Sequence, residues 1–176
     1  MTDGAERLAE GYRCEHCGQW VQSYRRSITG MMAATLIEMV RHVERTGARA
    51  VHVQSTIIPR IIARTRTGGS SGDYAKLRYW DLIQPWEANP VAGLPERKSA
   101  GLWIVTREGV QFAASLVAVP KYAHVYNGDV RRLSGPLVSI IECLGKRFSY
   151  SDLRGDSRLL RDGAPDPAAP AQLGLL

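Results

Sequence analysis

The sequence predicts an α+β protein in which helices dominate. From Arg26 to Arg45, apolar residues recur at steps of three and four, which places them along one face of a helix. The segments ARAVHV (48–53) and GLWIVT (101–106) have the composition of strands. Asn127-Gly128 lies between apolar flanks and predicts a tight hairpin turn. These patterns alternate along the chain, so we expect a mixed fold.

The first half of the chain predicts a helix, a strand and a second helix. Gly47 is placed to end the helix from Arg26 to Arg45. After the strand, Ser55 or Thr56 is expected to cap a helix over TIIPRIIARTRT (56–67), where Pro59 is tolerable only in the first turn. The alternative is that the strand continues through this segment.

The second half predicts shorter elements. GGSSGD (68–73) is a turn before a helix over YAKLRYWDLI (74–83), which Pro85 stops, and residues 87–100 read as a loop. REGVQFAASLV (107–117) predicts a short helix, and the apolar PLVSIIECLG (136–145) ends at Gly145. Leu77, Trp80, Leu82 and Ile83 are expected in the core.

The 176 residues are sufficient to bury a core without disulfides. The three cysteines are an odd number, and neither a secretory signal nor an apolar run of about 18 residues occurs. We therefore expect a cytoplasmic protein with reduced cysteines and no membrane association. No motif of a hydrolase, a phosphate-binding loop or a dinucleotide site occurs, so we expect a binding protein rather than an enzyme.

Positive charge is concentrated in one third of the chain. The segment from Arg25 to Arg78 holds ten basic and three acidic residues, a net charge of +7 within a total of +6. A clustered positive charge favours a polyanionic partner, because neutralising phosphates releases condensed counterions. The alternative is that these residues are the solvated faces of ordinary helices.

The region from Arg26 to Val117 resembles the winged helix-turn-helix family of DNA-binding domains. The resemblance rests on two motifs: Leu77, Trp80, Leu82 and Ile83 at the end of a helix, and Thr106-Arg107-Glu108-Gly109 after a strand. Asp81 stands where such helices often turn on a glycine. More loosely, the chain is similar to small phage-encoded proteins with an amino-terminal Cys-x-x-Cys.

The resemblance implies a double-stranded DNA partner and a domain organisation. Residues 1–25 would be an amino-terminal segment, 26–118 a winged-helix-like core, 119–154 a hairpin and helix extension, and 155–176 a disordered tail. Its implied nucleic-acid contacts are Arg64, Arg66, Ser70, Ser71, Tyr74, Lys76, Arg78, Tyr79, Arg97 and Lys98.

Cys14 and Cys17 have the Cys-x-x-Cys-Gly spacing of a zinc knuckle, in which a tight turn directs two thiolates at one ion. Tetrahedral coordination needs two more ligands, and no second Cys-x-x-Cys occurs. We expect His52 as a further ligand, with His42 as the alternative. Two alternative interpretations are that both thiols are reduced and bind no metal, or that the cysteine pairs of two chains share one ion.

Two functions remain open from the sequence. The first is a DNA-binding regulator or accessory factor of transcription. The second is an adaptor or inhibitor that docks on a larger host or viral protein complex through the same winged-helix-like body. The oligomeric state is not evident, and a dimer is compatible with either function.

Overall fold

The chain folds into two compact units. The computed structural model describes residues 7–8, 10–65, 73–86 and 101–160. Unit 1 comprises Met1–Ser27 and Pro120–Leu137, and unit 2 comprises Ile28–Val119 and Val138–Leu176. These boundaries differ from the ranges expected from the sequence, because the hairpin after residue 119 pairs with a strand that precedes the first long helix.

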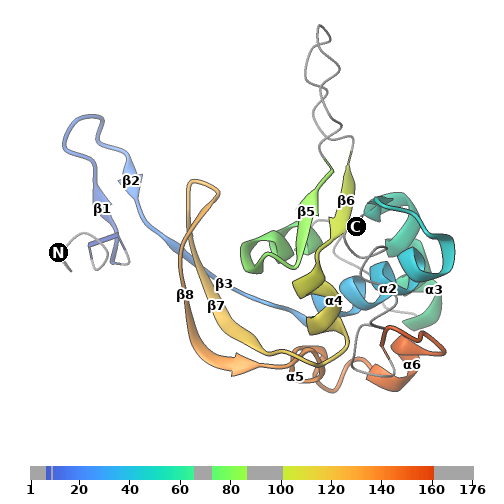
Figure 1. The fold of residues 1–176 in the computed structure, drawn as a ribbon. Helices are drawn as coiled ribbons and strands as arrows, with labels where there is room; N and C mark the ends of the chain where they lie inside the picture. The colour runs from blue at the N-terminus through green and yellow to red at the C-terminus, as the bar shows by residue number, and fades with distance from the viewer. Residues whose placement is uncertain (1–6, 9, 66–72, 87–100, 161–176) are drawn as a thin grey trace, which may run out of the picture. The chain divides into compact units, whose positions relative to one another are not determined.

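Unit 1 consists mainly of strands, with helical residues at 7–8 and 10 before them. β1 (Tyr12–Arg13) and β2 (Trp20–Val21) form a small antiparallel hairpin around the cysteine pair. A second sheet has the order β3-β7-β8, with β3 at Tyr24–Ser27, β7 at Val119–Tyr126 and β8 at Asp129–Val138. In Figure 1 its strands run side by side. The turn between β7 and β8 is the expected one, since Asn127 and Gly128 both have positive φ, 51° and 85°.

Unit 2 combines helices with a three-stranded antiparallel sheet of order β4-β6-β5. Its elements are α2 (Gly30–Thr46), β4 (Val51–His52), the π-helical turn η1 (Val53–Ile57), α3 (Ile58–Thr65), the 3-10 helix η2 (Asp73–Trp80), β5 (Ile83–Pro85), β6 (Leu102–Val105), α4 (Arg107–Ala113), α5 (Ile140–Leu144) and α6 (Tyr150–Arg154).

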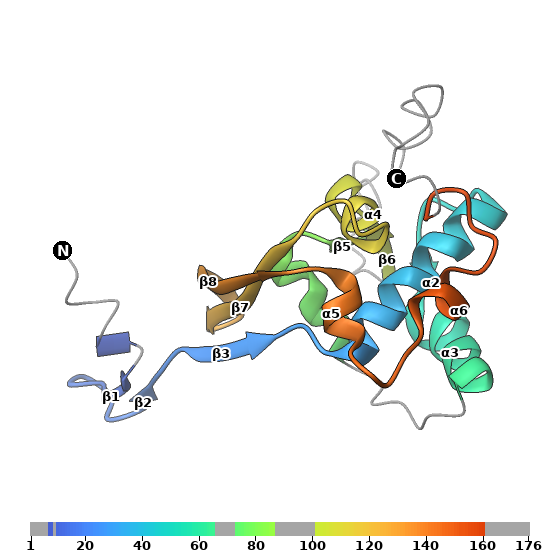
Figure 2. The same ribbon diagram turned by 90° about the horizontal axis from the view of Figure 1, so that it is seen from below.

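Helix α2 is the centre of unit 2. Thr29 caps its start by accepting a hydrogen bond from the Met32 N–H, and Gly47 ends it in the left-handed conformation, as expected. All nine residues from Met32 to Val40 are buried. The buried part of α2 is therefore wider than the single apolar face that the sequence predicted. The other helices surround α2, as Figure 2 shows. Its small residues Ala33 and Ala34 allow these helices to pack closely against it.

Several predicted boundaries were wrong for physical reasons. The first helix begins at Gly30 rather than Arg26, because Tyr24–Ser27 pairs with β7. The second helix is capped by His52 rather than Ser55 or Thr56, and passes through η1 into α3, where Pro59 lies in the first turn.

The helix expected over 74–83 is a 3-10 helix that ends at Trp80. Asp81 has a positive φ of 55°, a conformation that Asp tolerates better than most residues, and Ile83 begins β5. Leu77, Trp80, Leu82 and Ile83 are all buried, which confirms their assignment to the core.

The start of the tail is ordered between 155 and 160. The Glu44 carboxylate on α2 accepts hydrogen bonds from the Ser157 hydroxyl and from the Arg158 and Leu159 N–H groups. Leu160 is buried. The expectation of a disordered tail from Gly155 is therefore not met by these residues, and 161–176 lie outside the described residues.

The Thr106-x-x-Gly109 motif holds the turn between η2 and β5. The Thr106 hydroxyl caps α4 by accepting from the Gly109 N–H at 2.9 Å, and it donates to the Asp81 carbonyl at 2.6 Å. The Thr106 N–H donates to the Leu82 carbonyl. A Cβ on residue 109 would lie 2.0 Å from that same carbonyl oxygen, so only glycine allows this approach.

Replacing Gly109 by alanine should strongly destabilise unit 2. The new methyl group collides with backbone rather than with a flexible side chain, and we expect a loss of about 3 kcal/mol in the free energy of unfolding, measured by urea denaturation. Gly47→Ala is the matched control: its φ of 66° is strained for alanine, but the site is open, and about 1 kcal/mol is expected. Equal losses in the two variants would contradict the packing role of Gly109.

Candidate nucleic-acid interface

The 3-10 geometry of η2 sorts its side chains into three rows, because residues three apart eclipse one another. Tyr74, Leu77 and Trp80 form the inward row: Leu77 and Trp80 are buried, and Tyr74 meets the ring of Trp103 on β6 edge-on at 6.0 Å. Tyr74, an expected nucleic-acid contact, is therefore half-buried and helps to anchor the helix to the sheet.

The outer rows of η2 carry the other expected contacts. Lys76 forms an ion pair with Asp73, one turn earlier in the same row, so its charge is partly neutralised. Arg78 is exposed, and its guanidinium lies 5.3 Å from the centre of the Tyr79 ring. Arg78 forms no ion pair with any described residue. It is the strongest candidate on this helix for contact with an anion.

Arg64, another expected nucleic-acid contact, has a structural role within unit 2. Its guanidinium lies 3.0 Å from the buried carboxylate of Glu38, which also pairs with Arg41. The same guanidinium donates to the Asp152 carbonyl at 2.7 Å. Arg64 thus joins α3 to α2 and α6.

Five expected contacts cannot be placed. Arg66, Ser70, Ser71, Arg97 and Lys98 lie outside the described residues.

Several basic side chains of the segment from Arg25 to Arg78 have partners within unit 2. Arg41 and Arg64 compensate Glu38, Lys76 pairs with Asp73, and the Arg60 guanidinium contacts the His42 Nδ1 at 2.7 Å. The pairing with Glu38 and Asp73 is already counted in the net charge of +7 of this segment. Arg45 and Arg49 of the same segment are exposed.

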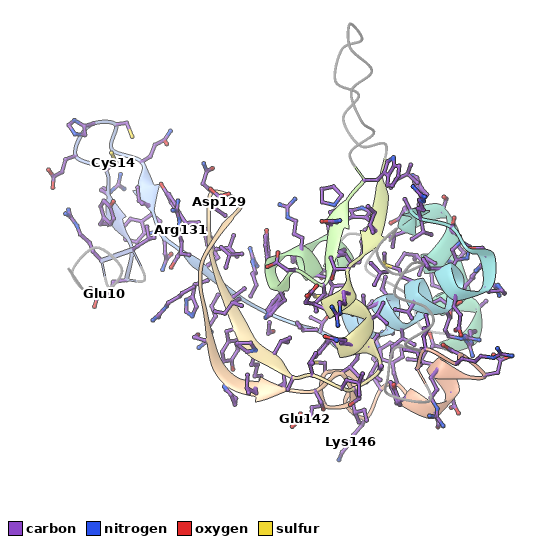
Figure 3. All side chains as sticks on the ribbon, in the orientation of Figure 1. Glu10, Cys14, Asp129, Arg131, Glu142 and Lys146 are labelled. Carbon is purple, nitrogen blue, oxygen red and sulfur yellow. The ribbon has the colours of Figure 1, made fainter. Side chains whose placement is uncertain are left out.

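The β3-β7-β8 sheet of unit 1 is a basic and aromatic surface that the sequence did not predict as a site. Arg25 and Arg26 on β3 and Lys121, Arg131 and Arg132 on β7 and β8 are all exposed. Figure 3 shows Arg131 close to the β7–β8 turn. The available signal was the alternation of Tyr122, His124 and Tyr126, which places three rings on one face of a strand.

The Cys14–Cys17 turn brings two free cysteine thiols together. The backbone N–H groups of Cys17 and His16, together with the Cys17 thiol, lower the pKa of Cys14. Gly18, at a φ of 68°, closes the turn by donating to the Cys14 carbonyl at 2.8 Å. Lowering a thiol pKa favours the thiolate that binds metal. Among the described residues, however, no three His, Cys, Asp or Glu side chains group as a metal site.

His52, the expected third ligand, belongs to unit 2 and has another role. Its Nδ1 accepts from the Ser55 N–H at 3.3 Å and contacts the Ser55 hydroxyl at 2.8 Å, which caps η1. On its other side, a Cβ on Gly101 would lie 2.9 Å from Nε2. The alternative ligand, His42, is bonded to Arg60. Both histidines expected as ligands therefore have hydrogen-bond partners within unit 2.

Comparison of this chain with protein-family models, with curated proteins and with solved structures finds no match. No helix in the described part of the chain is long and apolar enough to cross a membrane.

Arg64 and Arg78 should differ in their effects on stability. We expect Arg64→Ala to lower the free energy of unfolding by about 2 kcal/mol, because it removes one partner of a buried carboxylate and the link to α6. Arg78→Ala should change it by less than about 0.5 kcal/mol, because the side chain is exposed. Urea denaturation of both variants measures the difference, and a stable Arg64→Ala protein would contradict the structural role.

His42 should make the protein less stable in mild acid. Burial, followed by the charges of Arg60 and Arg45, lowers the pKa of His42 below 6.5. The folded state thus favours the neutral ring, which stabilises the fold relative to the unfolded chain. This contribution to the free energy of unfolding is complete above about pH 6.5 and is lost as the pH falls through the folded pKa. We expect His42→Gln to flatten the fall in unfolding free energy between neutral pH and pH about 5. An unchanged pH profile would contradict this assignment.

Proposed function

We propose that unit 2 is a winged-helix-like module that binds double-stranded DNA through η2, and that the protein is a DNA-binding regulator or accessory factor. The order helix, strand, helix, helix, strand, strand, with the third strand paired between the other two, supports the winged-helix part of the proposal. The Thr106-x-x-Gly109 turn, on which the sequence resemblance rests, supports it further, because it fixes the end of η2 against the sheet.

The exposed Arg78 and the half-buried Tyr79 beside it carry the DNA part of the proposal. A helix that contacts a groove needs one side anchored in its own domain and cations on the other. The row of Tyr74, Leu77 and Trp80 supplies the anchor, and Arg78 supplies a guanidinium that the described residues leave available for phosphate or a base edge. Stacking on Tyr79 restricts the guanidinium, so less side-chain entropy is lost on binding.

The two basic residues of η2 should contribute unequally to duplex binding. We expect Arg78→Ala to weaken binding of a fluorescent DNA duplex about tenfold and to reduce the slope of log affinity against log salt by about 0.9. Lys76→Ala should have a smaller effect, because Asp73 already offsets that charge. Fluorescence anisotropy over a salt series measures both quantities.

Lys146→Ala is the matched control, since Lys146 is exposed in unit 2 between α5 and α6. It removes the same charge without touching η2. If Arg78→Ala and Lys146→Ala behave alike, η2 is not the contact. A wild-type protein that fails to bind duplex DNA even at low salt would overturn the DNA proposal and favour docking on a protein.

A further inference from the structure

The sheet of unit 1 has a face built from three rings of one strand. Side chains of a strand alternate between faces, so Tyr122, His124 and Tyr126 on β7 point to the same side. Arg25 lies opposite His124 and Ser27 opposite Tyr122 in the β3–β7 pairing, which adds both to this side. We name the surface formed by Arg25, Tyr122, His124 and Tyr126 the β7 aromatic face.

Each tyrosine of this face is accompanied by a cation. The Arg25 guanidinium lies over the Tyr122 ring at 4.5 Å, with the Lys121 ammonium 5.6 Å from the same ring. The Arg131 guanidinium lies 5.5 Å from the Tyr126 ring. All three cations are exposed, and none forms an ion pair with a described residue. This differs from unit 2, where most basic side chains near the core have carboxylate or histidine partners.

The sheet as a whole is strongly positive. Residues 24–27 and 119–138 contain five basic residues, namely Arg25, Arg26, Lys121, Arg131 and Arg132, and one acid, Asp129. Burial is the main cause that lowers the pKa of His124, and the positive charges of Arg132 and Arg25 lower it further. A partner of this surface must therefore be an anion with groups that can stack on rings or guanidinium planes.

Single-stranded nucleic acid meets both requirements. Rings two residues apart on a strand are separated by about 6.6–6.8 Å, a distance that successive unstacked bases can span. Guanidinium groups held over tyrosine rings can stack on further bases or contact phosphates. In a duplex the base faces are already stacked on one another and cannot use such a surface.

We propose that the β7 aromatic face, with Lys121 and Arg131, binds single-stranded nucleic acid. This site is separate from the proposed duplex contact on η2 and does not depend on it. Two tyrosines provide stacking, and Arg25, Lys121 and Arg131 neutralise the backbone.

The test measures binding of fluorescent oligothymidylate and oligouridylate to the full chain by anisotropy over a salt series. For Arg25→Gln with Arg131→Gln we expect at least about a tenfold loss of affinity and a salt slope reduced by about 1.4, or 0.7 for each lost contact. For Tyr122→Leu with Tyr126→Leu we expect about a tenfold loss with an unchanged salt slope, because stacking is lost and charge is kept.

The matched control is Lys146→Gln with Arg147→Gln, which removes two exposed charges from unit 2. If the Arg25→Gln, Arg131→Gln variant binds the oligomers as tightly as this control does, the proposal is overturned. It is also overturned if the unit 1 surface binds a duplex more tightly than it binds either oligomer. If the tyrosine variants do not fold, the single variant Arg131→Gln tests the proposal, because Arg131 lies close to the hairpin turn. Arg78→Ala should leave oligomer binding unchanged, so failure at η2 and failure at this face are distinguishable.

Discussion

The carbonyl group of Leu82 fixes the relation between the helical and strand parts of unit 2. Its oxygen accepts a hydrogen bond from the Thr106 N–H. The same oxygen would lie 2.0 Å from a Cβ atom on residue 109. The Thr106 hydroxyl meanwhile bonds both the Asp81 carbonyl and the Gly109 N–H. One threonine and one glycine thus tie the end of η2, the start of β5 and the start of α4 together. The position of Arg78 and Tyr79, just before this turn, depends on that small group of backbone contacts.

The buried carboxylate of Glu38 is the second constraint, because it decides which arginines remain available. A carboxylate in the middle of a buried helix must be compensated, and Arg41 and Arg64 do so. In the sequence, these arginines look like part of one basic segment. In the structure Arg64 and Arg41 compensate Glu38, and Arg64 joins α2, α3 and α6. Arg78 on η2 stays exposed, as do the cations of the β3-β7-β8 sheet.

Local signals predicted much of the fold. The cap at Gly47, the Asn127-Gly128 turn and the core residues Leu77 and Ile83 depend on short-range chemistry that can be recognised without a structure. The 3-10 form of η2 could not be predicted, because the spacing of Leu77 and Trp80 fits either helix type. The site prediction was weaker still. Arg64 could not be distinguished from a surface arginine before its partner Glu38, 26 residues earlier, was placed beside it.

The sequence by itself determined that the first long helix ends at Gly47, that Asn127-Gly128 forms a hairpin turn, and that the chain is a basic α+β protein. These properties follow from residues a few positions apart, through capping, turn conformation and periodicity. Only the tertiary structure decided that β3 joins β7 across nearly one hundred residues, which gathers Arg25 and Tyr122 on one face. It also decided which charges are neutralised. Strand pairing and ion pairing join residues distant in the chain, and no local pattern specifies which partner each will meet.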